Sequence, residues 1–228
     1  MNKLWHLPFA FRISFAILAS TFWLAQPLAA QPDSDGFTSI FNGKDLSGWI
    51  YGKSADAKEG KGYQVEYGVL YCTPDDGGNL FTEKEYADFI LRFDFRLSPN
   101  ANNGIAIRAP LDANPAYAGM EIQVLDDSGP LHQDLRPAQY HGSIYDVVPA
   151  KRGHLNPVGE WNQEEITARG RHIAVKLNGA VIVDANLDQI KDADVLKRHP
   201  GLANTKGHIG FLGHGERVEF RNIRVKEL

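Results

Sequence analysis

Two carboxylates in the stretch GMEIQVLDDS, residues 119–128, could do chemistry together: Glu121 and Asp126. A retaining glycosidase uses two carboxyl groups that lie about 5–5.5 Å apart. The alternation of apolar and polar residues around Glu121 predicts a strand in which Glu121 and Gln123 share one face. Asp126 falls in the apolar register, so it is expected to leave the strand and hydrogen-bond its own turn, DDSGP. The alternation therefore separates the pair and leaves Glu121 on the candidate site face.

Short alternating runs separated by turn residues dominate the chain, and they must position these side chains. DFILRFDFRL (88–97) places five apolar residues on one face, and Asn178-Gly179 inside HIAVKLNGAVIVDA (172–185) is a strong hairpin signal. A helical turn is expected only within 185–198, and the stretch 126–160 is long enough to be a binding loop. The further expected strands lie in YQVEYGVLYC, GIAIRA, MEIQVL, KGHIGFLGH and RVEFRNIRVKEL. Eight or more such strands predict an all-β fold, an antiparallel β-sandwich.

The first thirty residues have the layout of a secretory signal peptide. Lys3 and Arg12 come before an apolar stretch that ends in small residues, and residues 1–30 contain no acidic residue. Cleavage near Ala30 predicts an exported protein, periplasmic or secreted, with no stable membrane insertion; the alternative is an uncleaved N-terminal anchor. Removing these two cations moves the formal charge from −4 to −6. A mildly acidic chain without a basic run argues against a nucleic-acid partner.

Several blocks in order resemble the 3-keto-disaccharide hydrolase domain family. They are GFTSIFNGKDLSGW, DFILRFDFRLSPNANNGIAIR, GMEIQVLDD, GEWN, KLNG and VEFRNIRVKEL, and they cover about residues 36–228. The resemblance implies a concanavalin A-like jelly roll in an exported protein. It also implies a carbohydrate substrate, a 3-keto-glycoside that a separate oxidoreductase has oxidised at C3. One departure is Asn103, which stands where the family often has serine.

The implied substrate suggests an elimination route. A ketone at C3 acidifies the proton on C2, so one base can form an enolate, expel the C1 substituent and leave an enone to which water adds. The hypothesis assigns Glu121 as base, Arg108 as the group that polarises the ketone, and His141 or Tyr145 as the acid at the departing oxygen. A loop histidine satisfied by backbone is the structural alternative for His141. The expected enzyme is therefore a 3-keto-glycoside hydrolase or lyase.

Four further residues are candidates for substrate binding: Gln123, Asn103, Trp161 and Lys151. Trp161 in GEWN could stack on a sugar ring or belong to the core, and Lys151 could simply keep its loop soluble. Scattered histidines and a lone Cys72 without Cys/His clustering predict no metal site and no cofactor, although aspartates near 126–134 could bind Ca²⁺.

Two other functions fit the same fold. A non-catalytic carbohydrate-binding module would use an exposed aromatic platform, and the mature chain offers only Trp49 and Trp161 as tryptophans. A conventional retaining endo-glucanase would need an E-x-D-x-x-E pattern. Gln123 and Asp126 depart from that pattern.

Overall fold

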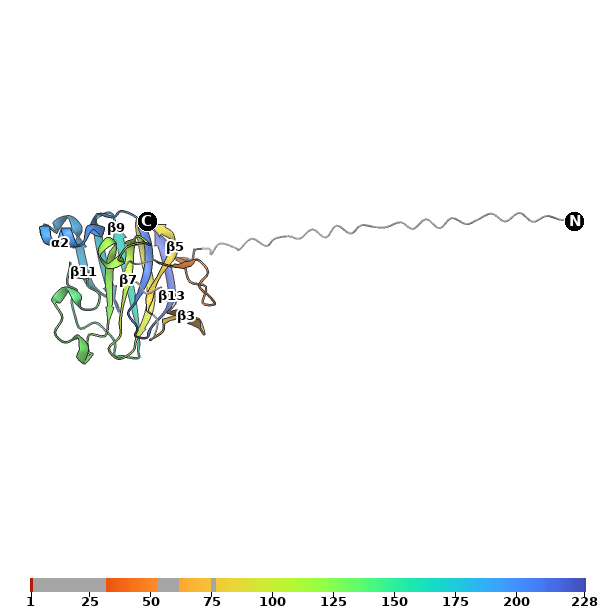
Figure 1. Cartoon of the computed structure of the whole chain (residues 1–228), viewed down its shortest axis with the longest axis horizontal. Helices are drawn as coiled ribbons and strands as arrows, with labels where there is room; N and C mark the ends of the chain where they lie inside the picture. Colours follow the sequence, from red (N-terminus) through yellow and green to blue (C-terminus); the bar gives the residue numbers. More distant parts are fainter. Residues whose placement is uncertain (2–31, 53–61, 75–76) are drawn as a thin grey trace.

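The computed structural model describes Met1 and residues 32–52, 62–74 and 77–228 of the chain. The predicted signal peptide, residues 1–30, lies outside the described residues except for Met1. Within the described part of the chain, no helix is both long and apolar enough to cross a membrane. The described residues form two antiparallel β-sheets with short helices at one end (Figure 1).

The larger sheet contains eight strands among the described residues. Its spatial order is β11 (Ala180–Asn186), β10 (His172–Leu177), β9 (Trp161–Arg169), β6 (Phe89–Leu97), β13 (Val218–Glu227), β4 (Val69–Cys72) and β3 (Tyr63–Glu66). The two-residue strand β1 (Thr38–Ser39) also pairs with β13. Asn178 and Gly179 both have positive φ angles and close the β10–β11 hairpin, as the sequence predicts.

The smaller sheet lies against the larger one and contains five described strands. Their order is β2 (Trp49–Tyr51), β5 (Gly78–Tyr86), β12 (Gly207–Gly213), β7 (Asn102–Ala109) and β8 (Met120–Leu125). All the pairings are antiparallel. The prediction of an antiparallel β-sandwich is therefore confirmed, while β2 and β5 are strands that the sequence reading did not identify.

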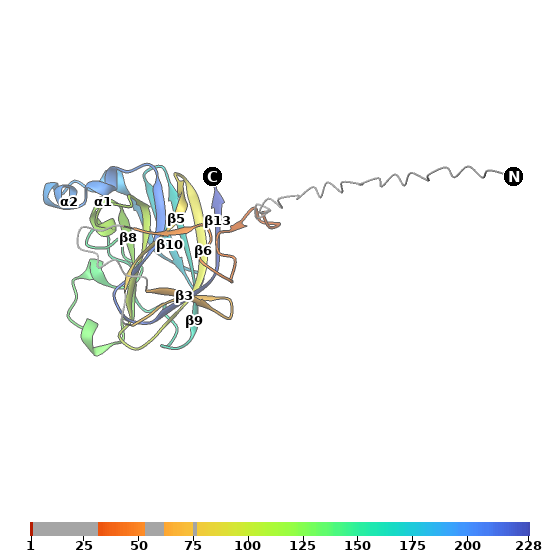
Figure 2. The same cartoon turned by 45° about the vertical axis from the view of Figure 1, so that its right-hand side comes forward.

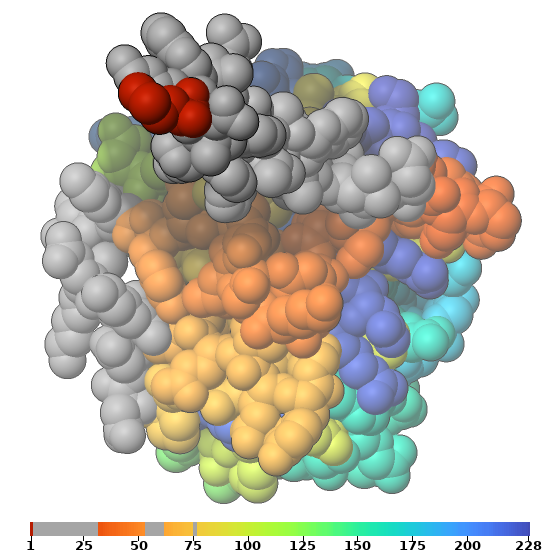
Figure 3. All heavy atoms as spheres, turned by 90° about the vertical axis from the view of Figure 1, so that its right-hand side faces the viewer, coloured from red at the N-terminus to blue at the C-terminus, as the bar shows by residue number. Residues whose placement is uncertain are grey.

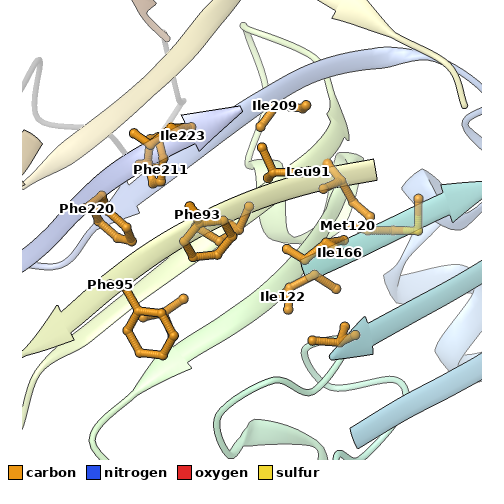
Figure 4. Close-up of a cluster of buried hydrophobic side chains, with 14 of the residues drawn as sticks. Leu91, Phe93, Phe95, Met120, Ile122, Ile166, Ile209, Phe211, Phe220 and Ile223 are labelled. Atoms are coloured by element: carbon orange, nitrogen blue, oxygen red, sulfur yellow. The ribbon is translucent and has the colours of Figure 1, made fainter. Parts of the chain in front are cut away.

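The core fills the space between the two sheets. Phe93 from β6 packs against its strand neighbour Phe95, against Phe211 from β12 and against Phe220 from β13, and the Phe211 and Phe220 ring centroids lie 4.4 Å apart (Figure 4). Alternate residues of β6 are buried, which confirms the register predicted for 88–97. Each large apolar side chain buried in this way stabilises the fold by about 1.5–3 kcal/mol.

The two described α-helices are short and lie at one end of the sandwich (Figure 2). Figure 2 shows α1 (Pro115–Ala118) and α2 (Ala193–Arg198) at that end, above β8. Only 193–198 of the predicted helical segment is α-helical; Leu187–Gln189 (η3) and Pro200–Ala203 (η4) are 3₁₀ turns. Two more 3₁₀ turns, Pro130–His132 (η1) and Pro137–Gln139 (η2), lie in the long excursion after β8.

The segment 32–52 crosses the outside of the molecule before the first hairpin. Figure 3 shows it in orange, beside the yellow-orange hairpin of β3 and β4. Trp49 anchors this segment, because its Nε1 donates to the Ile40 carbonyl at 2.8 Å while its ring packs 5.4 Å from Phe211. Trp49 is thus a core residue and offers no exposed platform.

Candidate active site

The outer face of the smaller sheet carries the candidate site, and strand pairing sets its composition. Glu121 of β8 lies opposite Ala106 of β7, and Gln123 lies opposite Gly104. The intervening residues Ile105 and Ile122 pair on the inner face and are fully buried. Because side chains alternate along a strand, the outer face receives one carboxyl group and one carboxamide above a floor of very small residues.

Glu121 is held over Gly104 in an apolar setting. A Cβ at position 104 would overlap Oε1 of Glu121, so only glycine leaves room for the carboxyl group. The residue is 5% exposed, and burial raises the pKa of Glu121 to about 8. Within the described parts of the chain, no hydrogen bond to this carboxyl group is found. A buried carboxyl group with no partner and a raised pKa is the pattern of a general base or acid.

Within the excursion that follows β8, residues 143–145 return beside this strand and complete this face. Gln123 N–H donates to the Ser143 carbonyl at 3.0 Å, Tyr145 N–H donates to the Glu121 carbonyl at 2.9 Å, and Ile144 bridges Ile122. This antiparallel pairing places Tyr145 on the same side as Glu121. The structure therefore brings together three residues predicted for the site: Glu121, Gln123 and Tyr145.

Gln139 links the polar side chains of this group. Its Nε2 donates to Tyr145 Oη at 3.1 Å, and its carbonyl accepts from Gln123 Nε2 at 3.4 Å. Gln123 Oε1 is buried and has no partner within the described residues. An unsatisfied buried amide oxygen is costly unless a ligand or water meets it, so Gln123 is a suitable ligand-binding group.

Asp146 gathers a second set of side chains next to Tyr145. Its carboxylate lies 2.7 Å from Arg136 Nη1 and 3.7 Å from both Arg198 Nη2 and His199 Nε2. The His199 ring packs against Tyr117 of α1, with centroids 5.0 Å apart. Burial raises the pKa of Tyr117, and the charges of Tyr145, Asp146 and Glu121 raise it further, so these groups lie within electrostatic reach of one another.

Arg108 is placed elsewhere, which corrects its assignment to the ketone. The register between β7 and β12 shifts here, and Arg108 has a φ of +49°, so a β-bulge redirects its side chain. The guanidinium is 1% exposed and donates to the carbonyls of Ala87, Gly170 and Asn204 and to the Asp88 carboxylate. Arg108 therefore ties loop ends together, and the simple alternation count failed because of the bulge.

Asn103 is also placed away from the candidate site. It shares the parity of Ile105 and faces the interior, where Asn103 Nδ2 donates to Tyr63 Oη at 3.1 Å and its Oδ1 accepts from Gly104 N–H. The expectation of a substrate contact is corrected by this burial. The replacement of the family's serine is accommodated by Tyr63.

His141 lies between the sheets instead of on the site face. Its ring stacks on Phe95 at 5.1 Å, Nδ1 accepts from Leu125 N–H at 3.2 Å, and Nε2 lies 3.1 Å from Glu164 Oε2. Because Nδ1 accepts a hydrogen bond, the proton of the neutral ring is on Nε2, facing Glu164. The proposed role as an acid at the departing oxygen is therefore corrected to an interior contact.

Trp161 and Lys151 likewise lie outside this face. The Trp161 ring is contacted by the guanidinium groups of Arg96 at 4.8 Å and Arg221 at 3.9 Å, on the outside of the larger sheet. Lys151 is exposed in the excursion. Neither residue is brought to Glu121.

Asp126 occupies the position that the alternation predicts. Its Oδ1 accepts from the Ser128 N–H and Oγ, and its Oδ2 accepts from Asn100 N–H at 2.8 Å. Burial tends to raise its pKa, but these hydrogen bonds outweigh burial and lower it. Asp126 therefore closes the turn after β8, and the two-carboxylate arrangement of a retaining glycosidase is absent from this stretch.

Six members of the site were not singled out from the sequence: Tyr117, Arg136, Gln139, Asp146, Arg198 and His199. They come from α1, the excursion, α2 and the residue after it, so only the tertiary fold brings them together. Gly104 did carry a signal, because a glycine inside a strand often marks a close approach. Among the described residues, no group of three or more His, Cys, Asp or Glu side chains is arranged to hold a metal ion.

A family model matches most of the chain. It is described as the 3-keto-alpha-glucoside-1,2-lyase-like domain, and it matches residues 36–226. A relative from Bacteroides thetaiotaomicron named 3-keto-disaccharide hydrolase is 29% identical over 236 aligned positions, which cover 86% of this chain and 80% of the relative.

Solved structures share the fold. A candidate glycosyl hydrolase from Parabacteroides distasonis is 26% identical with a TM-score of 0.70, and the alignment covers 85% of this chain and 94% of that one. A Bacillus subtilis protein of unknown function with a galectin-like fold has a TM-score of 0.54 at 13% identity, covering 84% of this chain and 94% of that one. The second similarity concerns the fold alone.

Proposed function

The chain belongs to the family of 3-keto-alpha-glucoside-1,2-lyase-like domains, and we propose that it cleaves 3-keto-glycosides by elimination followed by hydration. The name of its Bacteroides relative, 3-keto-disaccharide hydrolase, supports a glycoside hydrolase type of enzyme and a carbohydrate substrate. The observation that carries the proposal is the Glu121 carboxyl group, which is buried, has a raised pKa and has no hydrogen-bond partner among the residues that the structure describes.

Glu121 acts as the base in this proposal. It removes the proton from C2, and the electron pair of that bond forms an enolate with the C3 ketone. The C1–O bond then breaks as the enolate collapses to an enone. A carboxylate whose pKa is about 8 is a stronger base than an ordinary glutamate, which favours removal of a weakly acidic C–H proton.

Tyr145 and Gln123 supply the other two roles. The Tyr145 hydroxyl group, oriented by the hydrogen bond from Gln139, protonates the departing oxygen. The Gln123 carboxamide, whose own oxygen has no partner within the described residues, hydrogen-bonds the sugar and donates to the ketone oxygen as charge develops there. Water then adds at C1 of the enone and gives one proton back to the Tyr145 oxygen, while protonated Glu121 returns its proton to C2. No cofactor takes part in this scheme.

The remaining parts of the proposal rest on sequence. The leader-like residues 1–30 support export to the periplasm or the exterior. The ketone at C3 has to be introduced before this enzyme acts, so a separate oxidoreductase is its functional partner.

The test compares an oxidised substrate with its parent. The mature protein is incubated with 3-keto-trehalose and, separately, with trehalose, and released sugar is measured. We expect release from the ketone alone. Release from both sugars would contradict elimination and favour ordinary hydrolysis, while binding without release from either would favour a carbohydrate-binding module.

A further inference from the structure

An exposed aromatic ring stands at the rim of the candidate active site. Tyr117 of α1 is 37% exposed, and its hydroxyl group has no hydrogen-bond partner within the described residues. It lies four positions before Glu121, in the turn that leads into β8. An aromatic side chain left open to solvent next to buried polar groups is a feature of carbohydrate subsites, because sugar C–H groups pack on its face.

The Tyr117 ring is supported on one side by the His199 ring. His199 packs against it at 5.0 Å and is itself buried, and His199 Nε2 faces the Asp146 carboxylate at 3.7 Å. The pKa of His199 is lowered by burial despite Asp146, so the ring meets Tyr117 as a neutral surface. One face of Tyr117 is thus supported while the residue keeps an exposed part.

The helix that carries Tyr117 is locked to its neighbours. Asn204 Nδ2 donates to the carbonyls of Ala118 at 2.7 Å and Arg108 at 2.9 Å. Gly201 approaches so closely that a Cβ there would overlap the backbone at Ala118 and Gly119. Because α1 is fixed in this way, a ligand that stacks on Tyr117 has little ordering to do, which favours binding.

The position of this ring distinguishes it from the floor of the site. The floor is made by residues of β7 and β8, with Glu121 over Gly104. Tyr117 belongs to α1, which lies at the helical end of the sandwich seen in Figure 2 and leads into β8. Arg136 and Asp146, which lie on the same side, offer hydrogen bonds to hydroxyl groups.

We propose that Tyr117 is the platform of a leaving-group subsite, on which the second ring of a 3-keto-disaccharide stacks while the oxidised ring lies at Glu121. This inference rests on the proposed function and names the part of the substrate that the rim recognises. A ring-shaped leaving group would gain affinity from Tyr117, whereas a methyl group would not reach it.

The test measures selectivity between two leaving groups. kcat/KM is determined for 3-keto-trehalose and for methyl 3-keto-α-glucoside, and their ratio is compared among variants. We expect Tyr117→Ala and Tyr117→Leu to lower the ratio about tenfold, mainly through KM for the disaccharide, which corresponds to about 1.4 kcal/mol. Tyr117→Phe, which keeps the ring, should stay within about twofold of wild type. The unfolding midpoint of each variant is measured alongside.

Tyr67→Ala provides the matched control. Tyr67 is a highly exposed tyrosine in the turn between β3 and β4, on the larger sheet, and its removal should leave the ratio unchanged. An unchanged ratio in Tyr117→Ala, or an equal loss in Tyr117→Phe, would overturn the subsite while the proposed function stands. If the wild type cleaves neither ketone, the proposed function fails and the subsite fails with it.

Discussion

The two outer faces of the sandwich differ in whether their charged side chains form ion pairs. On the larger sheet, ion pairs link Arg92 with Glu165 at 2.5 Å and Arg221 with Asp94 at 3.1 Å. A groove of about 730 Å³ runs over this face, and its charged lining is mostly engaged in such pairs. On the smaller sheet, the Glu121 carboxyl group lies over glycine and alanine without a partner in the described structure.

This difference in ion pairing is the basis for placing the proposed active site on the smaller sheet. A paired carboxylate is stabilised in its charged form and makes a poor base, while burial without a partner makes Glu121 hold a proton more tightly. The groove of about 730 Å³ lies on the larger sheet, whereas the unpaired carboxyl group lies on the smaller sheet. Functional assignment in this fold therefore follows the unpaired group.

The largest expected effect comes from the same substitution made on each face. Glu121→Gln removes the base and should lower turnover of a 3-keto-glycoside by about 10²–10⁴-fold. Glu165→Gln removes one partner of a partly exposed ion pair and should cost about 0–1 kcal/mol of unfolding free energy without changing turnover. Steady-state kinetics and denaturant unfolding measure both. If Glu121→Gln and Glu165→Gln lost turnover equally, the assignment of the base to the smaller sheet would be contradicted.

Gly104→Ala should have the next largest effect. The new Cβ overlaps the Glu121 carboxyl group, so the base must move, and a displacement of about 1 Å can cost about 10²-fold in rate. Gly210→Ala serves as control, because its Cβ meets the Phe81 ring instead. Turnover per folded molecule that is as high in Gly104→Ala as in wild type would show that the carboxyl position does not matter.

The two faces should also respond to pH in opposite directions. Burial raises the pKa of Glu121 from its usual value of 4.5 to about 8 in the folded state, so its contribution to stability is full below pH 4.5 and is lost as pH rises through 8. For Glu219, burial tends to raise the pKa, but Arg217 and Arg96 outweigh it and lower the pKa. Its contribution is present above the unfolded pKa and is lost as pH falls through the folded value.

Unfolding free energies measured from pH 4 to pH 9 check this contrast. Glu121→Gln should become more stable than wild type as pH rises from 4.5 to 8, and Glu219→Gln should lose its deficit as pH falls below 4.5. Turnover by the wild type should rise about tenfold per pH unit below pH 8, as the carboxylate form accumulates. A turnover that is flat from pH 6 to pH 8 would contradict a base with this pKa.

The smallest effect is expected from Trp161→Leu on the larger sheet. Its ring is already contacted by two guanidinium groups, so KM for 3-keto-trehalose should stay within about twofold of wild type. If Trp161 instead stacked on the sugar, loss of about 1.4 kcal/mol would raise KM about tenfold. Such a rise would indicate that part of the substrate binds on the outer face of the larger sheet.

Most of the fold could be predicted from the alternation of apolar and polar residues along the sequence. The period-two pattern of 88–97 and the Asn178-Gly179 turn predicted β6 and the β10–β11 hairpin, because burial on one face and turn geometry are local properties. The strand β5 was not identified, since its exposed end, Glu83–Glu85, lacks a clear alternation of apolar residues. The helical segment 185–198 divided into η3 and α2.

The candidate site was predictable only where its residues sit on regular strands. Glu121 and Gln123 followed from the alternation of β8, and Tyr145 followed from its place in the long stretch after β8. Arg108 did not, because a bulge with a left-handed residue interrupts the count on β7. Asp146, His199 and Tyr117 lie in three different segments between strands, and no local sequence pattern predicts that these segments come together.

The most direct test of the central claim follows the proton on C2. A 3-keto-glycoside deuterated at C2 is given to the wild-type enzyme, and both the rate and the fate of the deuterium are measured. Because Glu121 is proposed to break that bond, cleavage should be slower than with the undeuterated substrate, and deuterium should be released to water to the extent that the Glu121 carboxyl group exchanges before it returns a proton to C2. Cleavage at an unchanged rate with deuterium retained at C2 would contradict the account.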